Sequence, residues 1–382
     1  MTSPVALELA RKMIGVAGSR FRIPTPALVV DMDRLEANVA AMAARAARAG
    51  VTLRPHAKTH KSAFIAALQK QHGAVGACCA KVGEAEALHA EGVRGILVTS
   101  PVATEALALR CVDLARSDPD FMVTVDHPQG VEHLKAAAEQ AGVAVNLVVD
   151  VDVGLGRTGV ASVADAVVLA TAISASPMLR FKGVQGYGGH WQHMKGAADR
   201  LAAIRFGMTR LAEVVEKLRS AGLTCEIITG GGTGSFEADV EIGLLSELQP
   251  GSYVFMDNQY VDALAGDPDG AFATALTVQT QIISNNAPKW LTTDAGLKAF
   301  ATDGPFPRPV TQAFAAQTYA YFGDEHGRLS RPADPDLCRH GVRLEVTDPH
   351  GDPTVDRYTH YHLVRGDVLV GIARIDAAGC SQ

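Results

Sequence analysis

The chain has 382 residues, of which 47% are hydrophobic and 20% are charged, and this is the composition of an ordinary soluble, globular protein. Its formal net charge of −6 does not favour nucleic acid or an anionic membrane as a partner. No apolar run approaches the roughly 18 residues of a membrane span. Charges at Glu8, Arg11 and Lys12 interrupt any apolar signal core, and the six cysteines fit neither a zinc spacing nor a disulfide framework. We therefore expect a cytoplasmic protein.

Between residue 51 and about residue 256, short apolar runs alternate with longer stretches rich in Ala, Leu and Glu. The runs predict eight strands, near Val51–Arg54, Ala74–Cys79, Gly95–Thr99, Phe121–Asp126, Val145–Val151, Phe181–Tyr187, Cys225–Thr229 and Gly251–Asp257. The longer stretches predict helices near 60–71, 82–91, 102–117, 129–142, 162–175 and 195–221. Eight alternating strands over about 200 residues predict a closed parallel (β/α)8 barrel. The alternative is an open doubly wound sheet, which normally has fewer strands and a glycine-rich turn after the first.

The segments outside this region predict a second, mostly β domain. Beyond residue 257, strands are expected at Thr277–Ile283, Lys289–Thr293, Val342–Thr347 and Asp367–Ile372. The early segment Thr25–Asp33 is also strand-like, precedes a helix at 34–49, and is expected to pair with this domain instead of the barrel. The predicted organisation is an N-terminal segment (1–50) that partly packs with the β domain, a barrel (51–260) and a C-terminal β domain (261–382).

The basic segment RPHAKTHK directly follows the first predicted barrel strand. Residues at the C-terminal ends of barrel strands line the active site, so Lys58 is the candidate nucleophilic amine. The neighbouring cations should lower its pKa and make the amine a better nucleophile. The alternative is a solvated basic loop without a chemical role.

Two glycine-rich loops follow later strands. In GLGRTG, Arg157 could hydrogen-bond a ring nitrogen or an anion, and the alternative is a tight turn with a surface arginine. TGGGTGS follows the seventh predicted strand, where barrels commonly bind phosphate, and its N–H groups could form an anion nest. A flexible linker is the alternative. The residues expected to hold the phosphate are Gly231, Gly232, Thr233, Gly251, Ser252 and Tyr253.

Two further segments could supply acid–base and metal-binding groups. GYGGHWQHM contains Tyr187, His190 and His193, and either histidine could act as a general acid or base or be only structural. In HGDPT, His350 and Asp352 could hold one divalent ion, and the oxygen ligand favours Mn²⁺ or Mg²⁺ over zinc. The alternative for HGDPT is a polar turn.

Together these segments resemble the D-threonine aldolase and D-serine dehydratase-like group, which are fold-type III pyridoxal phosphate (PLP) enzymes with an alanine-racemase-like barrel. The similarity runs over most of the chain. The matching segments are RPHAKTHK, CCAKVGEAEAL, VDVGLGRTGV, GYGGHWQHM, TGGGTGS, ELQPGSYVFMD, DAGLK, DEHG and HGDPT. The resemblance implies that Lys58 carries PLP as a Schiff base, that Arg157 faces the pyridine nitrogen and that Tyr187 lies by the cofactor. It also implies that TGGGTGS and the GSY turn hold the phosphate.

The same resemblance implies that His350 and Asp352 bind a divalent ion, with Mn²⁺ favoured over Mg²⁺ or another metal, and that the protein is a homodimer. The dehydratase branch of the group carries Cys at the position of Asp352, whereas the aldolase branch carries Asp. This residue favours retro-aldol cleavage of D-β-hydroxy-α-amino acids, with D-threonine giving glycine and acetaldehyde. His193, or a water on the metal, would remove the β-hydroxyl proton.

Three alternative functions stay open. They are a D-3-hydroxyaspartate aldolase, a dehydratase of D-serine or D-3-hydroxyaspartate, and a non-catalytic PLP-binding protein, against which the additional β domain argues. The chain also departs from the aldolase pattern. Asp356 and Thr359 stand where Asn and Asp are usual, and Ala378 stands where Arg is usual. These departures concern the surroundings of the expected metal site more than its ligands.

Overall fold

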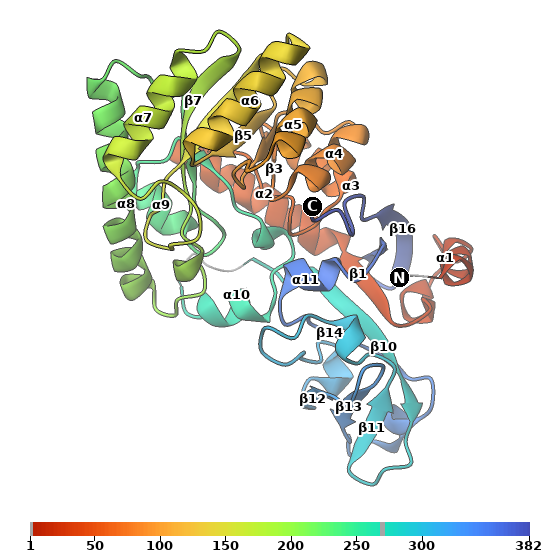
Figure 1. Ribbon diagram of the computed structural model, residues 1–382. Coiled ribbons are helices and arrows are strands. Elements are labelled where there is room, and N and C mark those ends of the chain that lie inside the picture. The colour runs from red at the N-terminus through yellow and green to blue at the C-terminus, as the bar shows by residue number, and fades with distance from the viewer. Residues whose placement is uncertain (1–2, 268–271) are drawn as a thin grey trace.

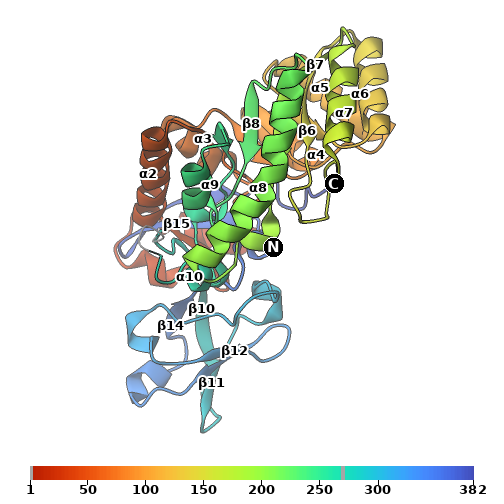
Figure 2. The same cartoon turned by 90° about the vertical axis from the view of Figure 1, so that its left-hand side faces the viewer.

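The computed structural model describes residues 3–267 and 272–382, and these residues form two eight-stranded sheets (Figures 1 and 2). The first sheet is parallel, and β2 pairs with β9 while the strands between them pair in chain order. A parallel bridge between His56, three residues beyond β2, and Cys78 of β3 brings the two ends of the sheet together, so the sheet closes on itself. This confirms the predicted barrel. Its strands are β2 (Thr52–Leu53), β3 (Ala77–Cys79), β4 (Ile96–Val98), β5 (Met122–Val125), β6 (Val145–Asp150), β7 (Leu179–Gly186), β8 (Ile227–Gly230) and β9 (Glu247–Leu248).

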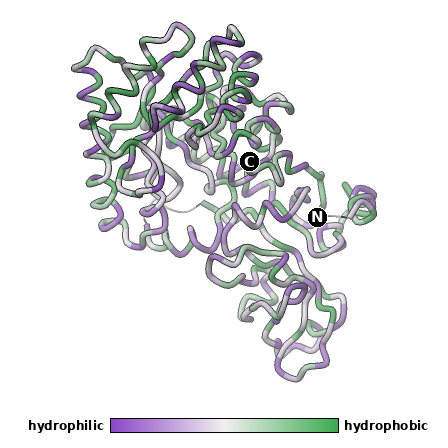
Figure 3. The backbone as a smooth tube through the Cα atoms, viewed as in Figure 1, coloured by the Kyte–Doolittle hydropathy of each residue, from purple (hydrophilic) through white to green (hydrophobic). Residues whose placement is uncertain are grey.

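Helices surround the barrel, as the alternating pattern predicted (Figure 1). They are α2 (Met32–Ala49), α3 (Ala63–Gln71), α4 (Val82–Ala90), α5 (Glu105–Ser117), α6 (Pro128–Ala141), α7 (Val163–Ser174), α8 (Ala197–Ser220) and α9 (Phe236–Ile242). The local sequence sets their ends. The Ser162 side chain accepts the Asp165 N–H at the start of α7, and Gly142 ends α6 in the left-handed conformation. Apolar and polar residues alternate along these helices (Figure 3), as expected where one face packs on a barrel.

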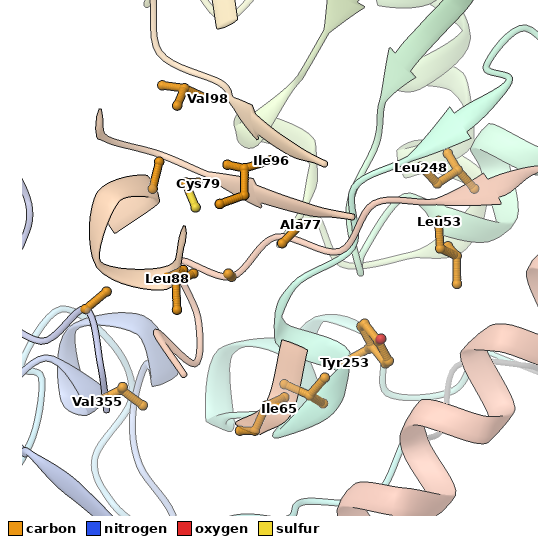
Figure 4. Close-up of a cluster of buried hydrophobic side chains, with 14 of the residues drawn as sticks. Leu53, Ile65, Ala77, Cys79, Leu88, Ile96, Val98, Leu248, Tyr253 and Val355 are labelled. Atoms are coloured by element: carbon orange, nitrogen blue, oxygen red, sulfur yellow. The ribbon is translucent and has the colours of Figure 1, made fainter. Parts of the chain in front are cut away.

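The barrel and the β domain share one hydrophobic core. Figure 4 shows Leu53, Ile96 and Leu248 from barrel strands in a cluster that also includes Ile65 from α3. Val355, from the C-terminal part of the chain, is completely buried in the same cluster. The segment around Val355 is therefore fixed against the barrel by apolar packing.

The prediction of the eighth barrel strand at Gly251–Asp257 is wrong. The eighth strand is β9, and Ser252–Val254 instead forms a short 3₁₀ helix, η3. Pro250 lacks an N–H and follows shortly after β9, which limits continuation of the ladder. Inside the barrel, Glu247 of β9 forms an ion pair with Arg54 at 3.0 Å.

The second sheet has the strand order β12-β13-β11-β10-β1-β15-β16, with β14 paired to β10. Strand β1 runs antiparallel to β10 and parallel to β15, so a segment that precedes the barrel lies inside the C-terminal sheet. The strands are β1 (Ala27–Asp31), β10 (Leu276–Ser284), β11 (Trp290–Thr293), β12 (Tyr319–Tyr321), β13 (Gly327–Ser330), β14 (Arg343–Val346), β15 (His360–Arg365) and β16 (Val368–Arg374).

Three more helices complete the described α structure. They are α1 (Pro4–Arg11), α10 (Asn258–Ala263) and α11 (Gly351–Val355). The further 3₁₀ helices are η1 (Ser19–Arg22), η2 (Gly189–Trp191), η4 (Leu297–Ala299), η5 (Gln312–Phe314) and η6 (Pro335–Cys338). Within the described ranges, no helix combines the length and the apolar character needed to cross a bilayer.

Candidate active site

Lys58 lies in the loop that follows β2, at the C-terminal end of the barrel. Its Nζ is 2.9 Å from Oδ2 of Asp352, and 39% of the Lys58 side chain is exposed. Asp352 belongs to α11, which leads into β15 of the second sheet. The candidate amine of the barrel and the candidate metal ligand of the β domain therefore meet at one ion pair.

The sequence predicted a lowered pKa for Lys58, and the structure contradicts this prediction. The Asp352 carboxylate raises the pKa of Lys58 above its usual value, against the opposing effect of burial. Burial would raise the pKa of Asp352, but the charges of Lys58 and His350 hold it below its usual range. The neighbouring histidines do not supply the expected positive charge, because burial lowers the pKa of His56 to about 3 and that of His60 to about 4. The Lys58 amine must therefore lose a proton before it can act as a nucleophile.

Two histidines lie beside this ion pair. His350 is at the start of α11, and its Nδ1 donates to Oδ2 of Asp303 at 2.7 Å, which leaves Nε2 as the nitrogen that can bind an ion. The ring of His193 lies 6.5 Å from the His350 ring and 4.4 Å from the ring of Tyr260 in α10, measured between centroids. Burial lowers the pKa of His193, and the charges of His350 and Lys58 lower it further. His193 is therefore a neutral imidazole near neutral pH, which can accept a proton.

The donor set around Asp352 fits a divalent ion. Its Oδ1 is buried and has no hydrogen-bond partner among the described residues, while Oδ2 pairs with Lys58. A buried carboxylate oxygen without a partner is costly, and a cation would satisfy it. No group of three or more His, Cys, Asp or Glu side chains within the described residues has the arrangement of a metal site. The protein could thus supply two ligands, His350 and Asp352, and leave other positions for substrate or water.

A cavity of about 560 Å³ opens beside Lys58 at the mouth of the barrel. This volume lies in the range of small-molecule and cofactor sites. Arg157, Tyr187 and Gln185 line it together with Lys58, and Cζ of Arg157 is 5.4 Å from the centroid of the Tyr187 ring. The cavity fits an aromatic ring carried on Lys58, and Arg157 is the cation that could meet a ring nitrogen.

The glycine-rich loop after β8 uses part of its hydrogen-bonding capacity internally. The N–H of Gly232 donates to Ser235 Oγ at 2.9 Å, and the N–H of Gly234 donates to Gln192 Oε1 at 3.0 Å. The N–H groups of Thr233 and Ser252 have no acceptor in the described part of the chain. These two donors could hold an anion, and they come from the two loops that the sequence singled out.

The Tyr253 side chain does not face this loop. Its hydroxyl accepts a hydrogen bond from Gln69 Nε2 at 3.0 Å in the core, and its N–H donates to Thr233 Oγ1 at 3.0 Å. Gly251, in contrast, touches the loop of Lys58, because a Cβ at Gly251 would lie 2.7 Å from Oγ1 of Thr59. That hydroxyl is buried and has no partner among the described residues. The GSY turn thus contacts the lysine loop through Gly251 instead of through the tyrosine ring.

A buried carboxyl group, Asp239, lies directly behind the glycine-rich loop. Ser235 Oγ accepts hydrogen bonds from the Gly232 N–H and from Gln192 Nε2, so its own proton donates to Asp239 Oδ2 at 2.6 Å. The other oxygen, Oδ1, is buried without a partner among the described residues. Burial raises the pKa of Asp239 to about 7, although the hydrogen bond from Ser235 opposes the shift.

We expect Asp239→Asn to stabilise the chain at pH 8 but not at pH 4. The folded pKa of about 7 lies above the ordinary carboxyl pKa of about 3.9, so the wild type loses stability as pH rises between these values. The upper limit of the loss is about 1.4 kcal/mol per unit of pKa shift. Melting temperatures of both cofactor-free proteins, measured from pH 4 to pH 8, should diverge across this window. If the two melting curves run parallel over this pH range, the raised pKa of Asp239 is contradicted. The control is Asp336→Asn, at an exposed residue, whose melting temperature should run parallel to that of the wild type.

Several residues around the ion pair could not be found from the sequence. Asp303 and Tyr260 lie in segments without a recognisable pattern, and they reach His350 and His193 only through the fold. Asp257 accepts the N–H of Gly351 at 2.8 Å and so supports the start of α11. Three other residues that the sequence analysis singled out make contacts outside this ion pair. His190 packs against Trp191, Thr359 Oγ1 bonds its neighbour His360, and Asp356 pairs with Lys61 at 2.7 Å.

The barrel with Lys58 at its mouth and the additional β domain define a member of the alanine-racemase-like PLP enzymes. The family profile described as alanine racemase, N-terminal domain, matches residues 30–259, and the one described as a putative serine dehydratase domain matches residues 275–364. The chain belongs to this family, in its D-threonine aldolase and D-serine dehydratase-like group, as the sequence predicted.

Relatives with assigned activities match nearly the whole chain. A D-threonine aldolase of Arthrobacter sp. is 39% identical over 94% of this chain and 94% of its own length. A 3-hydroxy-D-aspartate aldolase of Paracoccus denitrificans (strain Pd 1222) is 36% identical over 94% of this chain and 92% of the relative. The crystal structure of D-threonine aldolase from Filomicrobium marinum superposes with a TM-score of 0.90 at 34% identity, and covers 95% of this chain and 98% of that one. These matches confirm the predicted fold.

Proposed function

We propose that this protein is a PLP- and divalent-metal-dependent D-threonine aldolase, which cleaves D-β-hydroxy-α-amino acids and converts D-threonine into glycine and acetaldehyde. The observation that carries this proposal is the 2.9 Å ion pair between Lys58 and Asp352, because it places the candidate cofactor lysine beside the candidate metal ligand. The relatives named as aldolases support the reaction type. We also propose that the protein is a homodimer, as the family resemblance implies.

Different residues would hold PLP and the divalent ion. Lys58 would carry PLP, with Arg157 and Tyr187 at the ring, and this cofactor supplies a conjugated system that delocalises the electrons left on Cα. The phosphate would meet the N–H groups of the loops that the sequence assigned to it, at Gly231, Gly232, Thr233, Gly251, Ser252 and Tyr253, of which Thr233 and Ser252 have the unused donors. His350 and Asp352 would hold Mn²⁺, which lowers the pKa of a hydroxyl group bound beside it.

Two side chains of this protein, His193 and Lys58, would carry out the two proton transfers of the reaction. His193 is neutral and lies against Tyr260, whose ring limits its orientation, so it can take the proton from the β-hydroxyl oxygen as the Cα–Cβ bond breaks. Lys58 Nζ opens into the cavity that would hold the substrate and could return a proton to Cα, which yields glycine. His350 and Asp352 would hold the ion beside His193, whose ring centroid lies 6.5 Å from that of His350.

Substitution of His193 by Ala should lower kcat by about 10²–10⁴-fold, the usual contribution of a general base. The KM for D-threonine should change much less, because the imidazole acts on the proton and does not hold the amino acid. Steady-state kinetics at saturating Mn²⁺ and PLP measure both constants. The matched control is His190→Ala, since His190 lies in the same loop and packs on Trp191. An unchanged kcat in His193→Ala would assign the proton transfer to another group.

Product analysis tests the reaction itself. With D-threonine, PLP and Mn²⁺, the expected products are glycine and acetaldehyde in equal amounts, and a chelator should stop their formation until Mn²⁺ is added back. Activity that persists in chelator would remove His350 and Asp352 from the mechanism. A 2-keto acid with ammonia would instead identify a dehydratase.

A second candidate substrate is D-3-hydroxyaspartate. Lys81 also lines the cavity beside Lys58, and this cation, which the cofactor does not use, favours a substrate with a second carboxylate. The similarity to a 3-hydroxy-D-aspartate aldolase supports the same choice. Comparison of kcat/KM for D-threonine and D-3-hydroxyaspartate, with glyoxylate as the expected second product, decides between them.

A further inference from the structure

Lys61 is a buried lysine three residues beyond Lys58, and no role was assigned to it above. Only 6% of its side chain is exposed. Its backbone has φ of 50°, in the left-handed region that residues other than glycine rarely adopt. Its N–H donates to the carbonyl of Ala57 at 2.7 Å. The loop that carries Lys58 therefore ends in a tight turn, and contacts around Lys61 must stabilise this conformation.

The ammonium group of Lys61 has three acceptors around it. Nζ lies 2.7 Å from Oδ1 of Asp356, 3.0 Å from Oγ of Ser381 and 3.4 Å from Oε1 of Glu84. An ammonium group has three donors, of which hydrogen bonds to Asp356 and Ser381 use two, while Glu84 adds an ion pair. Because the charge is buried, removal of one partner would leave the others uncompensated. Lys61 is thus fixed in position by charge as well as by packing.

The first partner connects Lys61 to the β domain. Asp356 directly follows α11 and lies one helical turn beyond Asp352. The backbone of Lys61 makes a second connection, because its carbonyl accepts the N–H of Ala377 at 3.0 Å. Two bonds from one residue of the lysine loop therefore hold the segments on both sides of β15 and β16.

The second partner connects Lys61 to the wall of the cavity. Glu84 Oε2 accepts the N–H groups of Ala80 and Lys81, at 2.8 and 3.2 Å. Ala80 and Lys81 line the cavity beside Lys58. The lysine loop, the cavity wall and the helix of Asp352 are therefore all bonded, directly or through one residue, to the same ammonium group.

We propose that Lys61 is a positioning residue that sets the placement of Asp352 relative to Lys58, and so the metal site relative to the cofactor. This inference rests on the proposed function, since it assigns Lys61 a role in that site. Lys61 does not itself contact the cavity that Lys58 lines. Its loss should therefore weaken metal binding and the rate of cleavage, while PLP still binds at Lys58.

The test replaces Lys61 by Met, which keeps the length of the side chain and removes its charge. In the PLP-loaded protein, we expect the dissociation constant for Mn²⁺, measured by electron paramagnetic resonance of free Mn²⁺, to rise by about 10–100-fold. The visible absorbance of bound PLP should persist, and kcat for D-threonine should fall more than KM changes. Asp356→Asn keeps an acceptor for Nζ but removes the negative charge, so its Mn²⁺ affinity should lie between those of Lys61→Met and the wild type.

A matched control separates positioning from general loss of stability. Lys182 pairs with Glu226 at 2.6 Å near the start of β7, away from the C-terminal strand ends, and Lys182→Met should leave Mn²⁺ affinity unchanged. If Lys61→Met does not fold, Asp356→Leu removes the same bond from the other side and should weaken Mn²⁺ binding. If Lys61→Met and Asp356→Leu fold and bind Mn²⁺ as tightly as the wild type, the positioning role of Lys61 is overturned, while the proposed function stands. A wild-type protein that neither binds Mn²⁺ nor cleaves D-threonine overturns the proposed function as well.

Discussion

Substitution of Lys58 by Ala should abolish both the visible absorbance of bound PLP and the cleavage of D-threonine. The amine of Lys58 opens into the 560 Å³ cavity that Arg157 and Tyr187 also line. The variant should also free Asp352 from its ion pair, so the cofactor-free variant should bind Mn²⁺ more tightly than the cofactor-free wild type. Absorbance titration with PLP, product assay and Mn²⁺ titration measure these three effects.

Borohydride reduction provides the covalent form of this test. It should attach the cofactor permanently to the wild-type chain, and peptide mapping should find the label on Lys58. Lys182→Ala, which alters only a surface ion pair, should be labelled like the wild type. A label on any other lysine would contradict the assignment of Lys58, whatever the activity of the variants.

The second large effect is expected for Asp352→Asn. Loss of the negative charge removes the anionic ligand of the metal pair, so Mn²⁺ affinity should fall by more than the roughly 10–100-fold that loss of an outer-shell partner costs. Cleavage at fixed Mn²⁺ should fall with it, and added Mn²⁺ should restore it only in part. Calorimetric titration with Mn²⁺ and steady-state assays measure both quantities.

The control for this variant is Asp336→Asn, because Asp336 is 80% exposed and pairs only weakly with Arg339 at 3.7 Å. It should bind Mn²⁺ like the wild type. The opposite result at Asp352, an unchanged Mn²⁺ affinity, would show that the ion binds elsewhere. The 2.9 Å contact with Lys58 would then be a structural ion pair only.

The barrel and its principal lysine could be predicted because both depend on local patterns. The spacing of apolar runs reflects strands and helices directly, and a residue just after a strand lies at the barrel mouth whatever the rest of the chain does. The pKa of Lys58 could not be predicted in the same way. The sequence shows His56 and His60 beside it, whereas the fold makes both neutral and brings Asp352 to 2.9 Å.

The other differences also arise from contacts between distant segments. Glu247 is a charged residue in a buried strand, and its partners there, Arg54 and Thr229, come from other segments of the barrel. The Tyr253 ring turns into the core because Gln69 of α3 offers a hydrogen bond. Asp303 and Tyr260 carry no sequence signal, since their function depends wholly on the histidines that the fold places next to them.

The position of β1 has a consequence for the order in which the protein folds. Its two neighbours, β10 and β15, follow the barrel in the sequence and are synthesised after it. Residues 27–31 therefore have no strand partner until the barrel has been synthesised. Domains generally fold as units while the chain is produced, and pairing over such sequence separations is slow. The barrel can therefore form first, and the late closure of the second sheet around β1 brings α11 to Lys58. The candidate active site is then one of the last parts of the molecule to assemble.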